Sequence, residues 1–172
     1  MLRPPIDDKD QKFGENNTGV VLVEFGDYQC PHCGHAYPLL KKLMQEMYQE
    51  MTFVFRNFPL NEVHPFATMA ALAAEAAGAQ GKFWEMHDLI FENQRNLSND
   101  IFLDFSAALQ LDEKKFMNSW KSKDALAKVE RDFESGVRSG VNGTPTFFIN
   151  GAILSTYDGS YESLKNAVKN HT

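Results

Sequence analysis

Short apolar runs alternate with longer amphipathic stretches along this chain. Residues 20–25 form a valine-rich run, Val-Val-Leu-Val-Glu-Phe, which is typical of a strand buried on both faces in a parallel sheet. Residues 51–56 predict a second strand. Between the two runs, apolar residues recur at helical spacing, at Leu40, Leu43, Met44 and Met47. Residues 20–56 therefore predict a strand–helix–strand unit with a right-handed crossover.

The middle of the chain has a helical pattern from about Pro65 to Ser139. Pro65 suits the first position of a helix, and Gly78 is expected to end that helix. Further helices are predicted over residues 82–95, 99–110, 112–121 and 124–139. This block is all-helical and interrupts the pattern of strands.

A hairpin pattern follows near the C-terminus. Residues 146–149 and 152–154 flank Asn150-Gly151, the signal for a two-residue hairpin with a type I′ turn. Ser160 is expected to cap a final helix that extends to about Lys169. The chain therefore ends on strand, strand and helix.

The order of these elements predicts an α/β fold with a helical insertion. The sheet domain takes residues 20–62 and 141–172, and the all-helical insertion takes residues 63–140. Residues 1–19 are polar and contain two prolines and two glycines, so we expect an N-terminal arm, loosely attached to the domain.

Charge and composition exclude some classes of partner. The net charge of −6 and the absence of a dense Lys and Arg cluster argue against a nucleic-acid partner. The first ten residues have no apolar segment, which predicts neither a secretory signal nor membrane insertion. The sequence as it stands predicts a cytoplasmic protein. It would be periplasmic or exported if a signal peptide had been removed ahead of Met1.

Cys30 and Cys33 are the only cysteines of the chain, and they lie in Cys30-Pro31-His32-Cys33. A disulfide that closes so short a loop would stabilise the fold little, because the stabilisation grows with loop length. Two thiols at this spacing can instead form and open one small ring. The pair is therefore predicted to carry out dithiol–disulfide exchange.

The position of the pair at a helix start predicts different roles for the two thiols. The reactive species is the thiolate, and free N–H groups and the helix dipole at an N-terminus favour an anion at Cys30. A protonated His32 and a hydrogen bond from Cys33 would lower the pKa further. Cys30 is the predicted nucleophile and Cys33 the predicted resolving thiol. Pro31 suits the helix start, and His32 favours the oxidising direction.

Glu24 places an acid in the middle of the first predicted strand. Burying an unpaired carboxylate costs on the order of several kcal/mol, so its presence needs a reason. One interpretation is a proton acceptor beneath the active site that deprotonates Cys33 through water. The other is an edge position that faces solvent, and burial favours the first.

These features, together with Pro38 inside the first helix and Thr144-Pro145 before the hairpin, resemble the thioredoxin fold and in particular the DsbA-like thiol-disulfide oxidoreductases. The resemblance covers nearly the whole chain. It implies βαβ and ββα halves around a central sheet, a cis-proline at Pro145 opposite the motif, and backbone pairing of Thr144 with bound peptide. Residues 80–87 and 140–151 resemble a branch without signal peptides, some of whose members are fused to sodium/proton antiporters.

The resemblance implies a protein disulfide oxidoreductase that needs no cofactor beyond its redox-active disulfide. Its expected partners are protein or peptide thiols and disulfides, and an unidentified redox partner that recharges the pair. One alternative is a glutathione-linked reductase or transferase of the same fold, with glutathione as co-substrate. A second is a non-catalytic metal or cluster carrier; His35 and the cysteines would supply three ligands, whereas structural zinc usually takes four, so no metal is expected.

Overall fold

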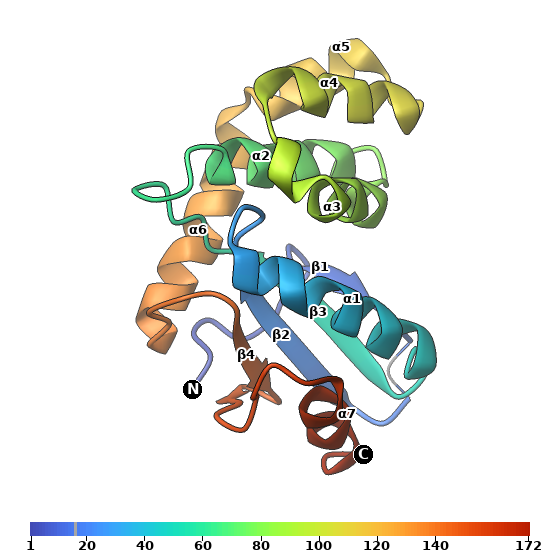
Figure 1. Cartoon of the computed structure of the whole chain (residues 1–172), viewed down its shortest axis with the longest axis vertical. Helices are drawn as coiled ribbons and strands as arrows, with labels where there is room; N and C mark the ends of the chain where they lie inside the picture. Colours follow the sequence, from blue (N-terminus) through green and yellow to red (C-terminus); the bar gives the residue numbers. More distant parts are fainter. Residues whose placement is uncertain (16) are drawn as a thin grey trace.

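A central sheet of five strands, in the order β1-β3-β2-β4-β5, is present in the computed structural model, which describes residues 1–15 and 17–172 (Figure 1). The strands are β1 Gln11–Phe13, β2 Val20–Gly26, β3 Met51–Asn57, β4 Thr146–Ile149 and β5 Ala152–Ile153. The central strand β2 is parallel to β3 and antiparallel to β4. The mixed α/β sheet predicted from the sequence is therefore confirmed, with one further strand, β1.

The helices follow the predicted order with shifted ends. They are α1 Pro31–Glu46, α2 Ala67–Gly78, α3 Phe83–Glu92, the 3-10 turn η1 Gln94–Asn96, α4 Asn99–Ala108, α5 Glu113–Trp120, α6 Lys123–Ser139 and α7 Tyr161–Lys169. The helix predicted over residues 82–95 ends earlier, at Glu92, so its predicted end is wrong. The side-chain amide of Asn93 donates back to the Leu89 carbonyl, and the 3-10 turn η1 follows. Pro65 is not a first helical residue either. The Phe66 N–H after it donates to Gln29 Oε1 instead of entering a helix.

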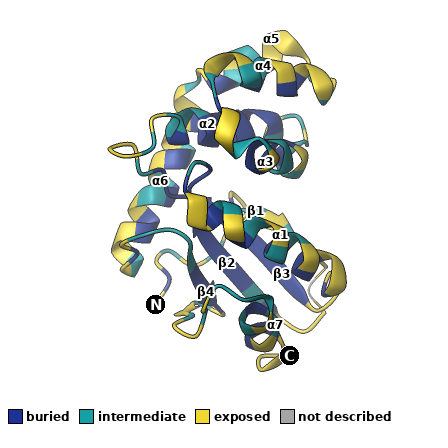
Figure 2. Ribbon diagram, in the orientation of Figure 1, coloured by how far each residue is buried: buried dark blue, intermediate teal, exposed yellow. Residues whose placement is uncertain are grey.

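The two faces of the sheet are covered by different segments. Helices α1 and α7 lie on one face, and α6 with the N-terminal segment lies on the other (Figure 1). Side chains alternate along β2, so Leu22 belongs to the α1 side of the core, whereas Val23 and Phe25 belong to the other. Glu24 therefore points to the face that α1 covers. Figure 2 shows β2 and β3 buried along their lengths.

The expectation of a loosely attached N-terminal arm is wrong. Residues 11–13 form β1, which pairs antiparallel with β3. Asp10 is buried and accepts two hydrogen bonds of 2.8 Å from Arg56 of β3, whose guanidinium also donates to the carbonyls of Pro4 and Pro5. The polar composition hid this attachment, because it depends on a buried arginine far along the chain.

The helices α2 to α5 stack at one end of the sheet (Figure 1). Helix α2 contacts α3, α5 and α6, and its alanines allow close packing on all sides. Helix α6 contacts both this stack and β3. The predicted boundary between the helical insertion and the sheet domain, at residue 140, thus falls at the end of α6, which contacts both the helical stack and the sheet. Among the described residues, no helix is long and apolar enough to cross a membrane.

Candidate active site

The two cysteines lie where β2 leads into α1. Cys30 is the N-cap of α1, with φ −69° and ψ 122°, and Pro31 takes the first helical position, where its missing N–H costs no helical hydrogen bond. Cys33 follows in the first turn. Both are free thiols, and the exposed fraction falls from 5% at Cys30 to 0% at Cys33. Both thiols are therefore buried, but Cys30 retains a small exposed fraction and Cys33 retains none.

Cys30 is the activated thiol of the pair. Its pKa is lowered to about 5, chiefly by a hydrogen bond with the Cys33 thiol. Thr144 and the backbone N–H groups of Cys33 and His32 add to the lowering, which outweighs the opposite effect of burial. Cys30 is a thiolate at neutral pH as a result, which is the nucleophilic form. The His32 side chain is exposed, and its effect on the direction of exchange stays a prediction.

Cys33 is shifted in the opposite direction. Burial raises the pKa of Cys33 well above its usual value, and the hydrogen bond with Cys30 and the charge of Glu24 act in the same direction. The Asp27 backbone N–H donates to its sulfur at 3.4 Å. The hydrogen bond between the two thiols and the burial of Cys33 thus separate two identical side chains into a thiolate and a protonated thiol.

Glu24 lies beneath this pair on the central strand, paired with Phe55 on one side and Phe147 on the other. It is 1% exposed, so the interpretation as a solvent-facing edge residue is wrong. Its Oε1 has no hydrogen-bond partner among the described residues. Burial, with a smaller contribution from the charge of Cys30, raises the pKa of Glu24 to about 8. A mostly neutral acid lies in the core below the cysteines.

The loop before β4 faces Cys30. The peptide bond between Thr144 and Pro145 is cis, as the resemblance implied, and the Thr144 carbonyl oxygen lies 3.4 Å from the Cys30 sulfur, where it accepts a hydrogen bond when Cys30 is protonated. The Thr144 hydroxyl is buried and has no partner among the residues described. The predicted site residues from β2, α1 and this loop are therefore brought together.

Two residues that the sequence did not single out flank the motif. Asp27 is buried, and its carboxylate accepts hydrogen bonds from the Leu60 and Gln29 N–H groups and contacts His64 Nδ1 at 2.8 Å. From the sequence, His35 is a candidate third metal ligand beside the cysteines. Its Nε2 is instead directed to the Gly159 carbonyl at 3.1 Å, in the loop before α7. His64 thus joins the loop after β3 to the active-site turn.

Gln94 of η1 was also missed. Its side-chain amide donates to the carbonyls of Tyr28 and Cys30, at 2.9 and 2.8 Å. A Cβ at Gly34 would lie only 2.3 Å from Gln94 Oε1, so glycine in the first helix allows this approach. A glycine inside a helix often marks such a contact, and Gly34 was the available signal. Gln94 fixes the orientation of the turn that carries Cys30.

A family model described as thioredoxin matches residues 7–170 of the chain. The chain belongs to the thioredoxin family. The family recognised from the sequence is confirmed.

The curated relatives of this thioredoxin-family protein are longer chains. It is 40% identical over 170 residues to the Na(+)/H(+) antiporter NhaA 1 of Salinispora arenicola, which covers 97% of this chain and 26% of that protein. It is also 40% identical over 151 residues to NhaA 3 of Salinispora tropica, which covers 87% of this chain and 23% of that protein. The chain spans about a quarter of the length of these relatives.

Solved structures share the fold. BdbD from Bacillus subtilis superposes with a TM-score of 0.85 at 20% identity, over 99% of this chain and 97% of that one. The thiol-disulfide exchange protein alpha-DsbA2 from Wolbachia pipientis gives 0.85 at 22% identity, over 96% and 89%. The predicted thioredoxin fold with its helical insertion is confirmed by these likenesses.

Proposed function

We propose that this thioredoxin-family protein exchanges disulfides with protein substrates through Cys30 and Cys33. The observation that carries the proposal is the opposite shift of the two thiols: the pKa of Cys30 is lowered to about 5, whereas that of Cys33 is raised. Exchange needs one thiolate that attacks or leaves readily and a second thiol that is protected until it is needed. The pair meets both needs.

In the oxidising direction, a substrate thiolate attacks Cys30 Sγ of the disulfide form. The Cys30–Cys33 bond breaks, a mixed disulfide forms with the substrate, and Cys33 leaves as a thiolate that takes up a proton. A second substrate thiolate then attacks the substrate sulfur, and Cys30 leaves as a stable thiolate. The substrate is oxidised by two electrons and the pair is reduced. A leaving group of low pKa favours this direction.

Glu24 is the proposed acid and base for the buried thiol. Its unpartnered carboxyl, with a pKa of about 8, can give a proton to the Cys33 thiolate in one direction and accept it in the other, directly or through water. A carboxylic acid with an ordinary pKa would already be ionised at neutral pH and could only accept. Burial therefore prepares Glu24 for both steps.

Thr144 and Pro145 form the proposed peptide contact. The cis bond places the Thr144 carbonyl at 3.4 Å from the Cys30 sulfur, and an extended substrate chain could pair with the Thr144 backbone. The structure of alpha-DsbA2, which shares the fold, is described as that of a thiol-disulfide exchange protein, and this agrees with exchange chemistry at the pair. The glutathione-linked reaction and the metal-carrier role stay predictions.

The proposal is tested by replacing each cysteine alone. Cys30→Ser should abolish both insulin reduction and the oxidation of a reduced peptide, because no thiolate remains to form the mixed disulfide. Cys33→Ser is the matched variant and should accumulate that mixed disulfide at Cys30, detectable by mass spectrometry. Undiminished exchange by Cys30→Ser would reject the proposal.

A further inference from the structure

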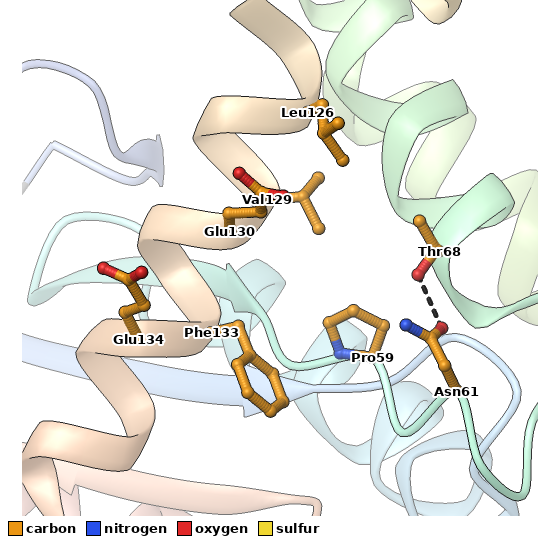
Figure 3. A pocket seen from close by; sticks show the side chains of 8 residues that line it. All are labelled: Pro59, Asn61, Thr68, Leu126, Val129, Glu130, Phe133 and Glu134. Carbon is orange, nitrogen blue, oxygen red and sulfur yellow. Dashed lines mark hydrogen bonds between the residues drawn. The ribbon is translucent and has the colours of Figure 1, made fainter. Parts of the chain in front are cut away.

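A groove lies between α6 and the loop that joins β3 to α2, and the reaction above does not use it. It has a volume of about 420 Å³. Figure 3 shows Leu126, Val129 and Phe133 of α6 on one side, with Pro59 and Asn61 on the other. Phe133 stacks on the buried Phe58 with ring centroids 4.5 Å apart, so the apolar floor is part of the core.

The charges along the groove are of one sign. Glu130 and Glu134 of α6 line it, are exposed, and are four residues apart on the helix, a spacing at which like charges repel. Other acidic and basic residues of α6 do form ion pairs, since Lys128 lies 2.6 Å from Asp132 and Arg131 contacts Asp7. In the part of the chain that the structure describes, neither glutamate has an ion-pair partner. A cationic partner would relieve this repulsion.

The groove adjoins the redox centre through the loop that forms its wall. In that loop, the Leu60 N–H and His64 Nδ1 both bond to the Asp27 carboxylate at 2.8 Å, and the Phe66 N–H donates to Gln29 Oε1 at 2.8 Å. Both acceptors belong to the turn that precedes Cys30. The opposite wall, α6, leads directly into the loop of Thr144 and Pro145. Hydrogen bonds therefore connect the loop that forms one wall of the groove to the turn that leads into the motif.

We propose that this groove binds a segment of the protein substrate that carries apolar side chains flanked by Lys or Arg. The inference rests on the proposed disulfide exchange and names the class of substrate that it favours. The apolar floor would take the aliphatic or aromatic side chains, and Glu130 and Glu134 would pair with the cations. Apolar contact would supply affinity, and the charges would supply selectivity and steering.

Binding is measured without exchange, on the full chain carrying Cys30→Ser and Cys33→Ser. The probes are two fluorescent peptides of equal length without cysteine, one with Leu, Phe and Lys and the other with each Lys replaced by Glu. Anisotropy should give about tenfold tighter binding of the Lys peptide at low salt, and the preference should shrink as salt is added. Glu130→Lys with Glu134→Lys should remove or invert the preference.

Asp104→Lys with Glu113→Lys is the matched control, because it makes the same change in net charge at exposed positions of α4 and α5. It should keep the preference. Leu126→Ser should weaken the binding of both peptides and leave their ratio unchanged, since Leu126 is an apolar group of the floor. Should the lysine variant not fold, Glu130→Gln with Glu134→Gln should reduce the preference in the same direction.

Equal binding of the two peptides, or a preference that survives charge reversal in the groove but not in the control, would overturn the proposal. So would a concentration-dependent dimer in sedimentation that the groove variant dissociates, because the occupant would then be a second copy. Oxidation of dithiothreitol by the chain with both cysteines is measured separately. If the chain does not oxidise dithiothreitol, the proposed function is rejected. The peptide-binding measurements test the groove proposal separately.

Discussion

The two faces of the sheet differ in whether a buried acid has a cation as its partner. On the face that α6 covers, Arg56 and Asp10 are both 7% exposed or less and form two hydrogen bonds of 2.8 Å. Burial would raise the pKa of Asp10, but the hydrogen bonds from Arg56 and the Asp7 backbone and the charges of Arg56 and Lys128 together outweigh it, and the pKa is lowered. On the α1 side, Glu24 has no cation beside it, and its Oε1 lacks a partner among the described residues.

The difference separates an acid with a fixed charge from an acid that can change its charge state near neutral pH. A paired acid keeps one charge state and joins segments, here the N-terminal segment to β3. An unpaired buried acid is neutral near pH 7 and can change its charge state when the charge beside it changes, as at Cys30 and Cys33. Four substitutions test this difference and the setting of the cysteine pair, and the largest expected effect comes first.

Arg56→Ala removes the cation from the paired side. It should lower the free energy of unfolding by about 3 to 5 kcal/mol, because Asp10 is left buried without its partner. Urea unfolding measures the change. Lys82→Ala is the control: Lys82 and Glu85 are an exposed pair, and its loss should cost no more than about 1 kcal/mol. Similar losses in both variants would show that the buried pair contributes no more to the free energy of unfolding than the exposed pair does.

Glu24→Gln tests the unpaired side. The folded pKa, about 8, is above the ordinary value of 4.5, so the stability contributed by the protonated form is complete below pH 4.5 and is lost as the pH rises to 8. Glutamine cannot ionise, so the variant should be more stable than the parent by about 2 to 3 kcal/mol at pH 6.5, and close to it at pH 4. Unfolding at the two pH values measures this difference.

The same variant should also slow the step in which Cys33 takes up or gives up its proton. Stopped-flow resolution of a mixed disulfide should lose its dependence on a group of pKa about 8. If the resolution rate of Glu24→Gln depends on pH in the same way as that of the parent protein, Glu24 has no role in the exchange reaction.

Cys33→Ala tests the source of the activated thiolate. Since the hydrogen bond with Cys33 contributes most to the lowering, its removal should raise the pKa of Cys30 by about 1 to 2 units. Thiolate absorbance at 240 nm against pH measures the shift. Cys33→Ser keeps a hydroxyl donor and should recover part of it. An unchanged pKa in the alanine variant would assign the lowering to the helix start alone.

Gln94→Ala should have the smallest effect. It removes two hydrogen bonds to the carbonyls of Tyr28 and Cys30, at a cost of about 1 to 2 kcal/mol in stability. The oriented N–H groups at the start of α1 should then hold the Cys30 thiolate less well, and its pKa should rise by a few tenths of a unit. Asn96→Ala, at an exposed position of η1, is the matched control and should change neither quantity.

Much of the fold could be predicted from patterns that are local in the chain. The valine-rich run gave β2, the helical spacing gave α1, and Asn150-Gly151 gave the hairpin turn, where both residues have positive φ of 47° and 81°. The ends of helices were predicted less well. At Pro65 and at residues 93–96 the chain leaves the helical path because distant residues, Gln29 and the carbonyl of Cys30, bind it there.

Most of the elements, the Cys30–Cys33 motif and the thioredoxin family could be recognised from the sequence, because spacing and residue type act over a few neighbours and need no knowledge of the rest of the fold. The tertiary structure alone decided which buried acid is paired. It also decided that residues 11–13 join the sheet, that Gln94 supports the motif, and that two glutamates border an apolar groove. Each of these depends on burial and on hydrogen bonds between segments far apart in the chain, which no local pattern records.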